Sequence, residues 1–216
     1  MEQYRARVKQ LGFKHKSTRI ETDYLPDTPD GLCKRNGLLL RFRENQTSNS
    51  TTWLLTLKKR SAASGIMDFE EIETDFGNPD NETFEHINQL VRAATGRSLD
   101  KVVLRSTDLS QVREAMRSCG FTKERILLDK YREEYGKARS NITLDFFPDG
   151  MGAYLEVEAH SKAKLDVIVF WLQISSGQII TTDYGNLLKE YKRNLPPKRQ
   201  RVALFTPAQR LKLLGK

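Results

Sequence analysis

The stretch Leu38-Leu39-Leu40-Arg41-Phe42-Arg43 ends in a strict alternation of large apolar and cationic side chains. Successive side chains of a β-strand point to opposite faces, so a strand at 37–44 places Arg41 and Arg43 on one face and its apolar residues on the other. One face of this strand therefore suits a hydrophobic core, and the opposite face carries two positive charges.

Charged residues at the same two-residue spacing recur in the other segments that alternate in this way. We expect strands at 18–25, 37–44, 53–59, 68–76, 121–135, 140–147 and 152–159. Beyond the arginine pair, their polar faces carry Thr56 and Lys58; Glu71 and Glu73; Lys130, Arg132 and Glu134; Asp145; and Glu156 and Glu158. Apolar residues occupy the alternate positions, so each strand is predicted to have one apolar face.

Apolar residues at helical spacing lie between these groups of strands, which predicts an α+β fold. We expect helices at 2–11, 82–95, 109–119, 162–175 and 183–193. The first 191 residues carry no net charge, whereas residues 192–216 hold eight Lys and Arg and no acid, which accounts for the net charge of +8. The chain is therefore divided into one domain at 1–193 and a basic C-terminal tail at 194–216, most simply a solvated one.

Composition excludes several classes of protein. An apolar content of 38% with 30% charged residues argues against a disordered chain, and no apolar run approaches the roughly 20 residues of a membrane-spanning helix. The first residues lack the apolar stretch of a secretion signal. Cys33 and Cys119 have no zinc-site or disulfide spacing. We expect a cytoplasmic protein that does not enter a membrane, and the sequence does not predict its oligomeric state.

Two interpretations of the charged faces are open. Any one of them is most simply the solvent face of an antiparallel sheet. Taken together, the strands favour a second interpretation, in which helices cover the apolar faces and the sheet curls into a barrel lined by both signs of charge. Such a lining is costly to desolvate unless it holds water or a charged ligand.

Arginines and lysines on separate strands suit an anion with many oxygens. The carboxylates beside them would repel such an anion, unless they hold a divalent cation that bridges it. Mg²⁺ and Mn²⁺ prefer oxygen ligands, commonly one or two carboxylates together with phosphate oxygens and water. The pattern therefore predicts a polyphosphate site and phosphoryl- or nucleotidyl-transfer chemistry.

The order and spacing of these motifs resemble the CYTH superfamily, whose members are also called triphosphate tunnel metalloenzymes. The resemblance runs from residue 2 to about residue 193. The matching stretches are Tyr24 to Asp30, Leu38 to Arg43, Leu55-Thr56-Leu57-Lys58, Glu70 to Glu73, Lys130-Tyr131-Arg132, Leu144-Asp145 and Gly152 to Glu158. The family includes class IV adenylate cyclases, thiamine triphosphatases and inorganic triphosphatases.

The resemblance implies an eight-stranded antiparallel tunnel, flanked by helices, that holds a triphosphate. It implies phosphate binding by Arg41, Arg43, Lys58, Lys130 and Arg132, and binding of Mg²⁺ or Mn²⁺ by Glu156 and Glu158. Asp145 and one of Glu71 or Glu73 would complete the acidic wall, with that choice left open and Glu70 on the excluded face. Lys58, Arg132 and Asp145 are the residues expected to be catalytic.

Two departures from the family pattern stand out. The signature Glu-x-Glu-x-Lys of the family's first strand is not in the chain, and Thr182 stands where the family has a lysine before Ser-Tyr. Either the natural protein carries the strand upstream of Met1, or the chain is a divergent relative that binds without turnover. We expect the first, because a barrel that lacks a strand exposes two edges.

The leading hypothesis is metal-dependent hydrolysis of an organic or inorganic triphosphate. The alternatives are a class IV adenylate cyclase, which forms cyclic AMP and pyrophosphate from ATP, and a non-catalytic module that binds polyphosphate or RNA. The expected partner is a small molecule that contains a triphosphate. Nucleic acid is expected, if at all, only at the basic tail.

Overall fold

The structure, a computed structural model of the 216-residue chain, describes residues 1–60, 69–76, 79–106 and 108–216. The strands are β1 (Lys14–Asp27), β2 (Leu38–Gln46), β3 (Thr51–Arg60), β4 (Phe69–Asp75), β5 (Lys123–Lys137), β6 (Ser140–Phe147), β7 (Gly152–Ala159) and β8 (Val202–Ala203). The α-helices are α1 (Glu2–Gln10), α2 (Leu32–Arg35), α3 (Asn81–Thr95), α4 (Leu109–Ser118), α5 (Lys162–Trp171), α6 (Tyr184–Tyr191) and α7 (Pro207–Leu213), and the 3₁₀ helices are η1 (Lys101–Arg105), η2 (Ser176–Gln178) and η3 (Arg199–Arg201). The predicted α+β class is confirmed. The expected strand at 68–76 begins at Asp68, which lies outside the described residues.

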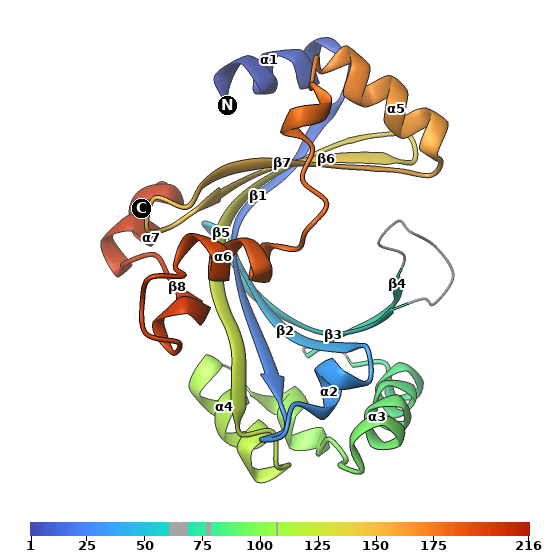
Figure 1. Cartoon of the computed structure of the whole chain (residues 1–216), viewed down its shortest axis with the longest axis vertical. Coiled ribbons are helices and arrows are strands. Elements are labelled where there is room, and N and C mark those ends of the chain that lie inside the picture. The colour runs from blue at the N-terminus through green and yellow to red at the C-terminus, as the bar shows by residue number, and fades with distance from the viewer. Residues whose placement is uncertain (61–68, 77–78, 107) are drawn as a thin grey trace.

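All eight strands belong to one sheet, whose main order is β4-β3-β2-β1-β5-β6-β7, with every neighbouring pair antiparallel. The short β8 pairs in parallel with β5. The sheet is strongly curved, so one of its faces is concave (Figure 1). Among the described residues no pairing joins β4 to β7, so the sheet is not closed and forms a trough, and its strong curvature agrees with the predicted tunnel-like fold.

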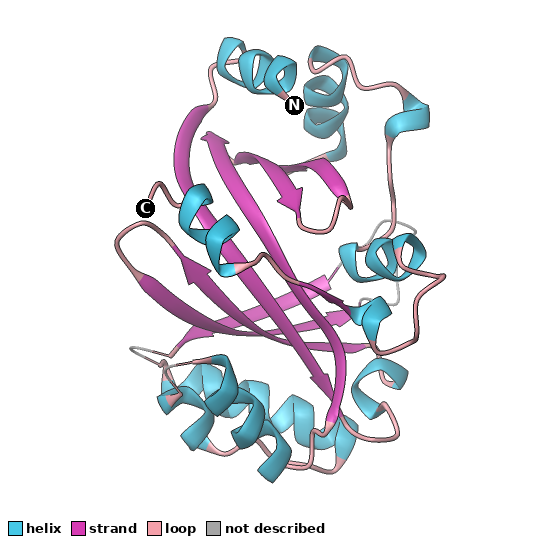
Figure 2. Cartoon of the chain, turned by 90° about the vertical axis from the view of Figure 1, so that its left-hand side faces the viewer, coloured by secondary structure: helices cyan, strands magenta, loops and turns pink. Residues whose placement is uncertain are grey.

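Most of the helices cover the convex face, in two groups. Leu40 and Leu55 of the sheet pack with Phe84 of α3 and Val112 of α4 in one cluster. A second cluster brings the convex side of β6 against α1 and α5. The two groups lie at opposite ends of the molecule (Figures 1 and 2). None of the described helices is both long enough and apolar enough to cross a membrane.

A third apolar cluster lies on the concave side of the sheet, beneath α6. Leu25, Ile126 and Phe147 point from three strands toward Leu188 of the helix, which is fully buried. These residues share the strand parity of the charged ones, so the concave face is apolar beneath α6 and polar elsewhere. Helix α6 therefore closes one part of the trough and leaves the charged part accessible.

The expectation of a solvated C-terminal tail is wrong, because this segment folds back onto the convex face. Arg210 of α7 donates hydrogen bonds to Thr22 (3.0 Å), Asp129 (3.3 Å) and Glu44 (3.3 Å), which lie on β1, β5 and β2. Burial raises the pKa of both carboxyl groups, and the positive charge of Arg210 opposes that rise. Arg210 of the C-terminal segment thus compensates the negative charge of Asp129 and Glu44 on the sheet. The division of the chain at residue 193 stays a prediction.

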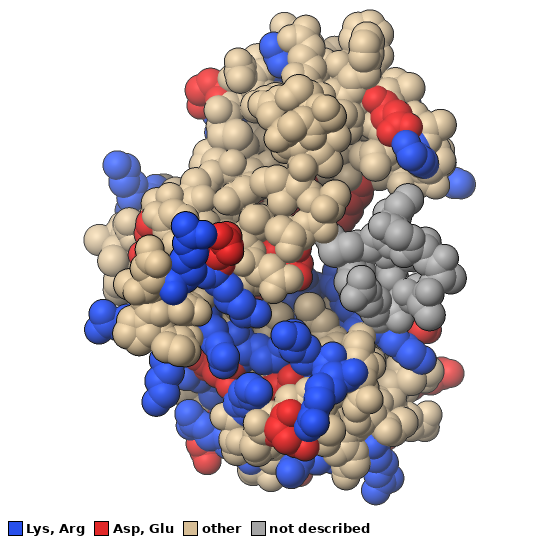
Figure 3. Space-filling view, in the orientation of Figure 1, with Lys and Arg blue, Asp and Glu red and all other residues tan. Residues whose placement is uncertain are grey.

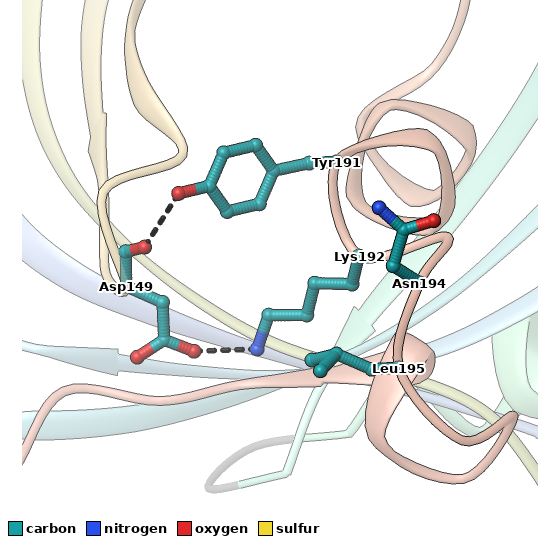
Figure 4. Close-up of a pocket in the computed structure, with 5 residues that line it drawn as sticks. All are labelled: Asp149, Tyr191, Lys192, Asn194 and Leu195. Atoms are coloured by element: carbon teal, nitrogen blue, oxygen red, sulfur yellow. Dashed lines mark hydrogen bonds and ion pairs between the residues drawn. The ribbon is translucent and has the colours of Figure 1, made fainter.

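Lys192 anchors the beginning of the same segment. Its ammonium group contacts the Asp149 carboxylate and the Val202 carbonyl, and the Tyr191 hydroxyl donates to the Asp149 carbonyl (2.8 Å). A pocket of about 380 Å³ opens between these residues and Asn194 and Leu195 (Figure 4). Tyr191 and Lys192 already bind Asp149, so these polar groups of the pocket are not free to bind a ligand.

Candidate functional site

A continuous network of ion pairs lines the concave face, and we call it the concave network. Its cations are Lys16, Arg19, Arg41, Arg43, Lys58, Lys130 and Arg132, and its acids are Glu21, Asp23, Glu71, Glu73, Glu134, Asp145 and Glu156. Each member lies within 4.0 Å of at least one partner of opposite charge. All the predicted site residues except Glu158 belong to this network.

The centre of the network is a pair of acids on β1 that sequence reasoning missed. Glu21 is fully buried and lies 2.9 Å from the Lys130 ammonium and 3.1 Å from the Arg43 guanidinium. Asp23 accepts two hydrogen bonds from Arg43, at 2.6 Å and 2.9 Å. The alternation of Arg19, Glu21 and Asp23 was the available signal, since it has the same spacing as the charged pairs of the other strands.

These contacts keep both acids ionised. Burial raises the pKa of a carboxyl group, but the charges of Lys130 and Arg43 outweigh it and hold the pKa of Glu21 below its ordinary range. The pKa of Asp23 is likewise well below its ordinary value, because Arg43 and Lys130 outweigh burial. Burial, followed by repulsion from Arg43, lowers the pKa of Lys130. The cations are thus held in place by buried negative charge.

Arg132 organises the side of the site formed by β6 and β7. Its guanidinium donates to both oxygens of Asp145, at 2.7 Å and 2.6 Å, and to Glu156 at 2.7 Å. Tyr184 of α6 donates its hydroxyl proton to Asp145 (2.9 Å), and the Lys130 ammonium lies 5.5 Å from the Tyr184 ring centroid. Both oxygens of the fully buried Asp145 therefore have partners, and this side chain fixes Arg132 and Tyr184.

The opposite side of the site is formed by β3 and β4. Lys58 lies 2.9 Å from Glu71, and Thr56 donates a hydrogen bond to Glu73 (2.7 Å). Arg41 contacts both acids, at 3.3 Å and 3.7 Å, so the concave face holds Glu71 and Glu73 together where the sequence left the choice open. Glu70, which pairs in register with Lys59, has the opposite parity, as predicted.

The carboxylates that suit a divalent cation best are Glu156 and Glu158. They lie two residues apart on β7, so their side chains share the concave face. Glu156 is half-exposed, and Glu158 is exposed and forms no ion pair within the described part of the chain. No group of three or more potential ligands gathers among the described residues. Two carboxylates fit Mg²⁺ or Mn²⁺ when phosphate oxygens and water complete the coordination.

The concave network has no surplus charge, because its seven cations face seven acids, and Glu158 adds a further acid to the same face. A triphosphate carries several negative charges and would gain little net attraction from such a lining. The hollow beside the cationic surface is visible in Figure 3, with acidic side chains at its edge. Divalent cations would supply the missing positive charge, so the arrangement favours joint binding of metal and polyphosphate.

Comparison with known proteins agrees with this geometry. The sequence model of the CYTH domain matches residues 2–176. Among solved structures, the PH1819 protein of Pyrococcus horikoshii is similar, with a TM-score of 0.64 and 20% identity over 88% of this chain and 94% of its own. A conserved hypothetical protein of Pyrococcus furiosus has a TM-score of 0.61 and 16% identity, over 86% and 93%.

A Vibrio parahaemolyticus protein, provisionally assigned as an adenylate cyclase, has a TM-score of 0.57 and 18% identity, over 87% of this chain and 90% of its own. Among curated proteins, none matches the chain. At these identities the solved structures establish the likeness of fold, and the match over residues 2–176 establishes the family.

Proposed function

The chain belongs to the CYTH domain family, and from this premise we propose that it hydrolyses an organic or inorganic triphosphate with the help of a divalent cation. The observation that carries the proposal is the concave network, in which cations from β2, β3 and β5 converge above buried acids. Positioning and charge neutralisation are the main requirements of phosphoryl transfer, and this lining supplies both.

The cations of the network bind and orient the substrate in this proposal. Arg41, Arg43 and Lys130 hold the phosphates at the floor of the trough, where they are already fixed by Glu21 and Asp23. Lys58 and Arg132 lie on opposite sides of that floor and stabilise the charge that develops on the transferred group. Asp145 acts by positioning Arg132, because both of its oxygens are occupied.

In the reaction, a water oxygen bonds to the terminal phosphorus while the bond from that phosphorus to the bridging oxygen breaks. The electron pair of the broken bond leaves with the remaining diphosphate, and the proton lost by the attacking water passes through solvent to the phosphate products. A divalent cation held by Glu156 and Glu158, or alternatively by Glu71 and Glu73, would polarise the phosphate oxygens. The half-exposed acids at the edges of the trough keep this position open to solvent and therefore to the attacking water.

A second candidate is an adenylate cyclase, which the provisional assignment of the similar Vibrio protein favours. In that reaction the 3′-hydroxyl of ATP attacks the α-phosphorus, and pyrophosphate is released. The same trough could hold the same three phosphates, so the phosphate-binding residues do not distinguish the two reactions. The products distinguish them.

The experiment is to incubate the protein with tripolyphosphate, thiamine triphosphate or ATP and either Mg²⁺ or Mn²⁺, and to identify the products. We expect orthophosphate from at least one substrate, and none when EDTA removes the metal. Formation of cyclic AMP and pyrophosphate from ATP would contradict the hydrolase and identify the protein as an adenylate cyclase. Metal-independent binding of polyphosphate without any product would contradict both and favour a binding module.

A further inference from the structure

A second group of cations lies beside α6, outside the concave network, and we call it the basic cluster. Its members come from four elements: Lys34 of α2, Lys123 and Arg125 of β5, Lys189 of α6 and Arg201 of η3. Lys189 interacts electrostatically with Lys34, Arg125 and Arg201, and Lys123 lies beside Gly31 and Asp27 next to α2. Figure 3 shows a band of Lys and Arg side chains across this face, below α6 and next to the hollow of the trough. The proposed triphosphate hydrolysis assigns no role to these residues.

One buried acid, Asp27, lies beside Arg125 of the cluster, and its oxygens already accept several hydrogen bonds. Asp27 accepts hydrogen bonds from the backbone N–H groups of Thr28 (2.8 Å), Cys33 (2.9 Å) and Lys34 (3.2 Å). The Arg125 guanidinium lies 3.9 Å from the same carboxylate. The other four cations form no ion pair within the described part of the chain, so the cluster carries surplus positive charge.

This surplus charge is partly removed from solvent. Lys123, Lys189 and Arg201 are only partly exposed, although an unpaired cation is normally well solvated. Burial lowers the pKa of Lys189, and the charges of Lys34 and Arg125 lower it further, outweighing the opposite effect of Asp183. Half-buried cations that repel one another destabilise the free protein, and a bound anion would remove that cost.

Helix α6 connects the cluster to the trough. Its first residue, Tyr184, contacts Asp145 of the concave network, and Lys189 follows five residues later. At about 1.5 Å of rise per residue, the two positions lie roughly 7–8 Å apart along the helix axis. A ligand that leaves the trough beside α6 therefore needs to extend by only a few phosphate groups to reach the basic cluster.

We propose that the basic cluster is a second anion subsite, which binds the continuing phosphates of a linear inorganic polyphosphate whose terminal triphosphate lies in the concave network. The inference rests on the proposed function for the position of that terminal triphosphate. In this proposal the charge-balanced trough and the positively charged cluster bind different parts of the same ligand. The trough positions the reacting end with its metal, and the cluster supplies affinity for the rest of the chain.

The composition of the cluster favours a bare phosphate chain over a nucleic acid. Single-stranded nucleic acids are bound by cationic grooves that also offer aromatic side chains for stacking. The cluster consists of lysines and arginines alone. Tyr191, the exposed aromatic residue of α6, donates its hydroxyl proton to the Asp149 carbonyl beside the pocket of Figure 4.

The test compares the affinities of the full chain for tripolyphosphate and for long-chain inorganic polyphosphate, by calorimetry with Mg²⁺ present. We expect the wild type to bind the long chain at least about tenfold more tightly. A Lys189→Ala, Arg201→Ala double variant should lose this preference while keeping its affinity for tripolyphosphate within about threefold. A Lys189→Gln, Arg201→Gln variant with an unchanged melting temperature guards against a folding defect.

The matched control is a Lys212→Ala, Lys216→Ala double variant, which removes the same charge from exposed positions in and after α7. It should keep the preference for the long chain. An equal loss in the control would overturn the proposal, because it would show attraction to net charge alone. Tighter cluster-dependent binding of a 5′-triphosphorylated oligonucleotide than of polyphosphate would also overturn it.

The outcomes separate this inference from the proposed function. Hydrolysis of tripolyphosphate without any preference for longer chains would contradict the subsite and leave the hydrolase intact. A preference that depends on Lys189 and Arg201, in a protein that forms no product, would support the subsite and contradict the hydrolase.

Discussion

Replacement of Arg43 by alanine is expected to lower the free energy of unfolding by about 3–5 kcal/mol. Arg43 is 8% exposed, donates to both oxygens of Asp23, and lies 3.1 Å from Glu21. Without it, two buried carboxylates share the remaining cations, chiefly Lys130, and one negative charge is left uncompensated. Urea denaturation of the purified variant measures the effect.

The control for this experiment is Arg193→Ala, which also removes an arginine from an ion pair. Arg193 and Glu190 lie 2.9 Å apart, but both side chains are about 70% exposed, so the expected loss is below about 1 kcal/mol. An Asp23→Asn substitution added to Arg43→Ala should recover part of the stability. Equal unfolding midpoints for Arg43→Ala and Arg193→Ala would contradict the buried network as described.

Lys58→Ala is expected to reduce kcat/KM for the preferred triphosphate by about 10²–10³, which is the usual effect of removing one donor from a site of developing charge. The fold should be little affected, because Lys58 is 26% exposed and its ion-pair partner Glu71 is 42% exposed. Steady-state kinetics with Mg²⁺, together with the melting temperature, separates the loss of catalysis from a loss of structure.

Lys59→Ala provides the matched control, since Lys59 is the next residue of β3 and points to the opposite face. Its kcat/KM should stay within about twofold of the wild type. A similar decrease in both variants would mean that the face on which the lysine lies has no bearing on turnover, and the site proposed for the concave face would then be wrong.

Strand parity allowed much of the site to be predicted. The alternation within β2, β3, β4 and β7 placed Arg41, Lys58, Glu71 and Glu156 on one common face, and the structure confirms this placement. Parity is a local property fixed by the period of two, so it can be derived from a single sequence. Which faces meet in space depends on sheet order. The strands taken together favoured a shared charged interior, and the family resemblance implied its tunnel form.

Pairing between distant segments explains what the sequence did not reveal. Glu21 and Asp23 become the centre of the site because β1 pairs with β5, which brings them close to Lys130, although Asp23 is 107 residues from it in the chain. The tail was misjudged for the same reason. Arg210 binds Asp129 and Glu44, but nothing within residues 194–216 indicates that the sheet offers these acids.

The central claim is that the charge-balanced trough binds triphosphate together with a divalent cation. The most direct measurement is a calorimetric titration of the Lys189→Ala, Arg201→Ala variant with tripolyphosphate, which removes the contribution of the basic cluster. With Mg²⁺ present we predict saturable binding, and with EDTA an affinity at least about tenfold weaker. Equal affinity in Mg²⁺ and in EDTA would contradict the claim.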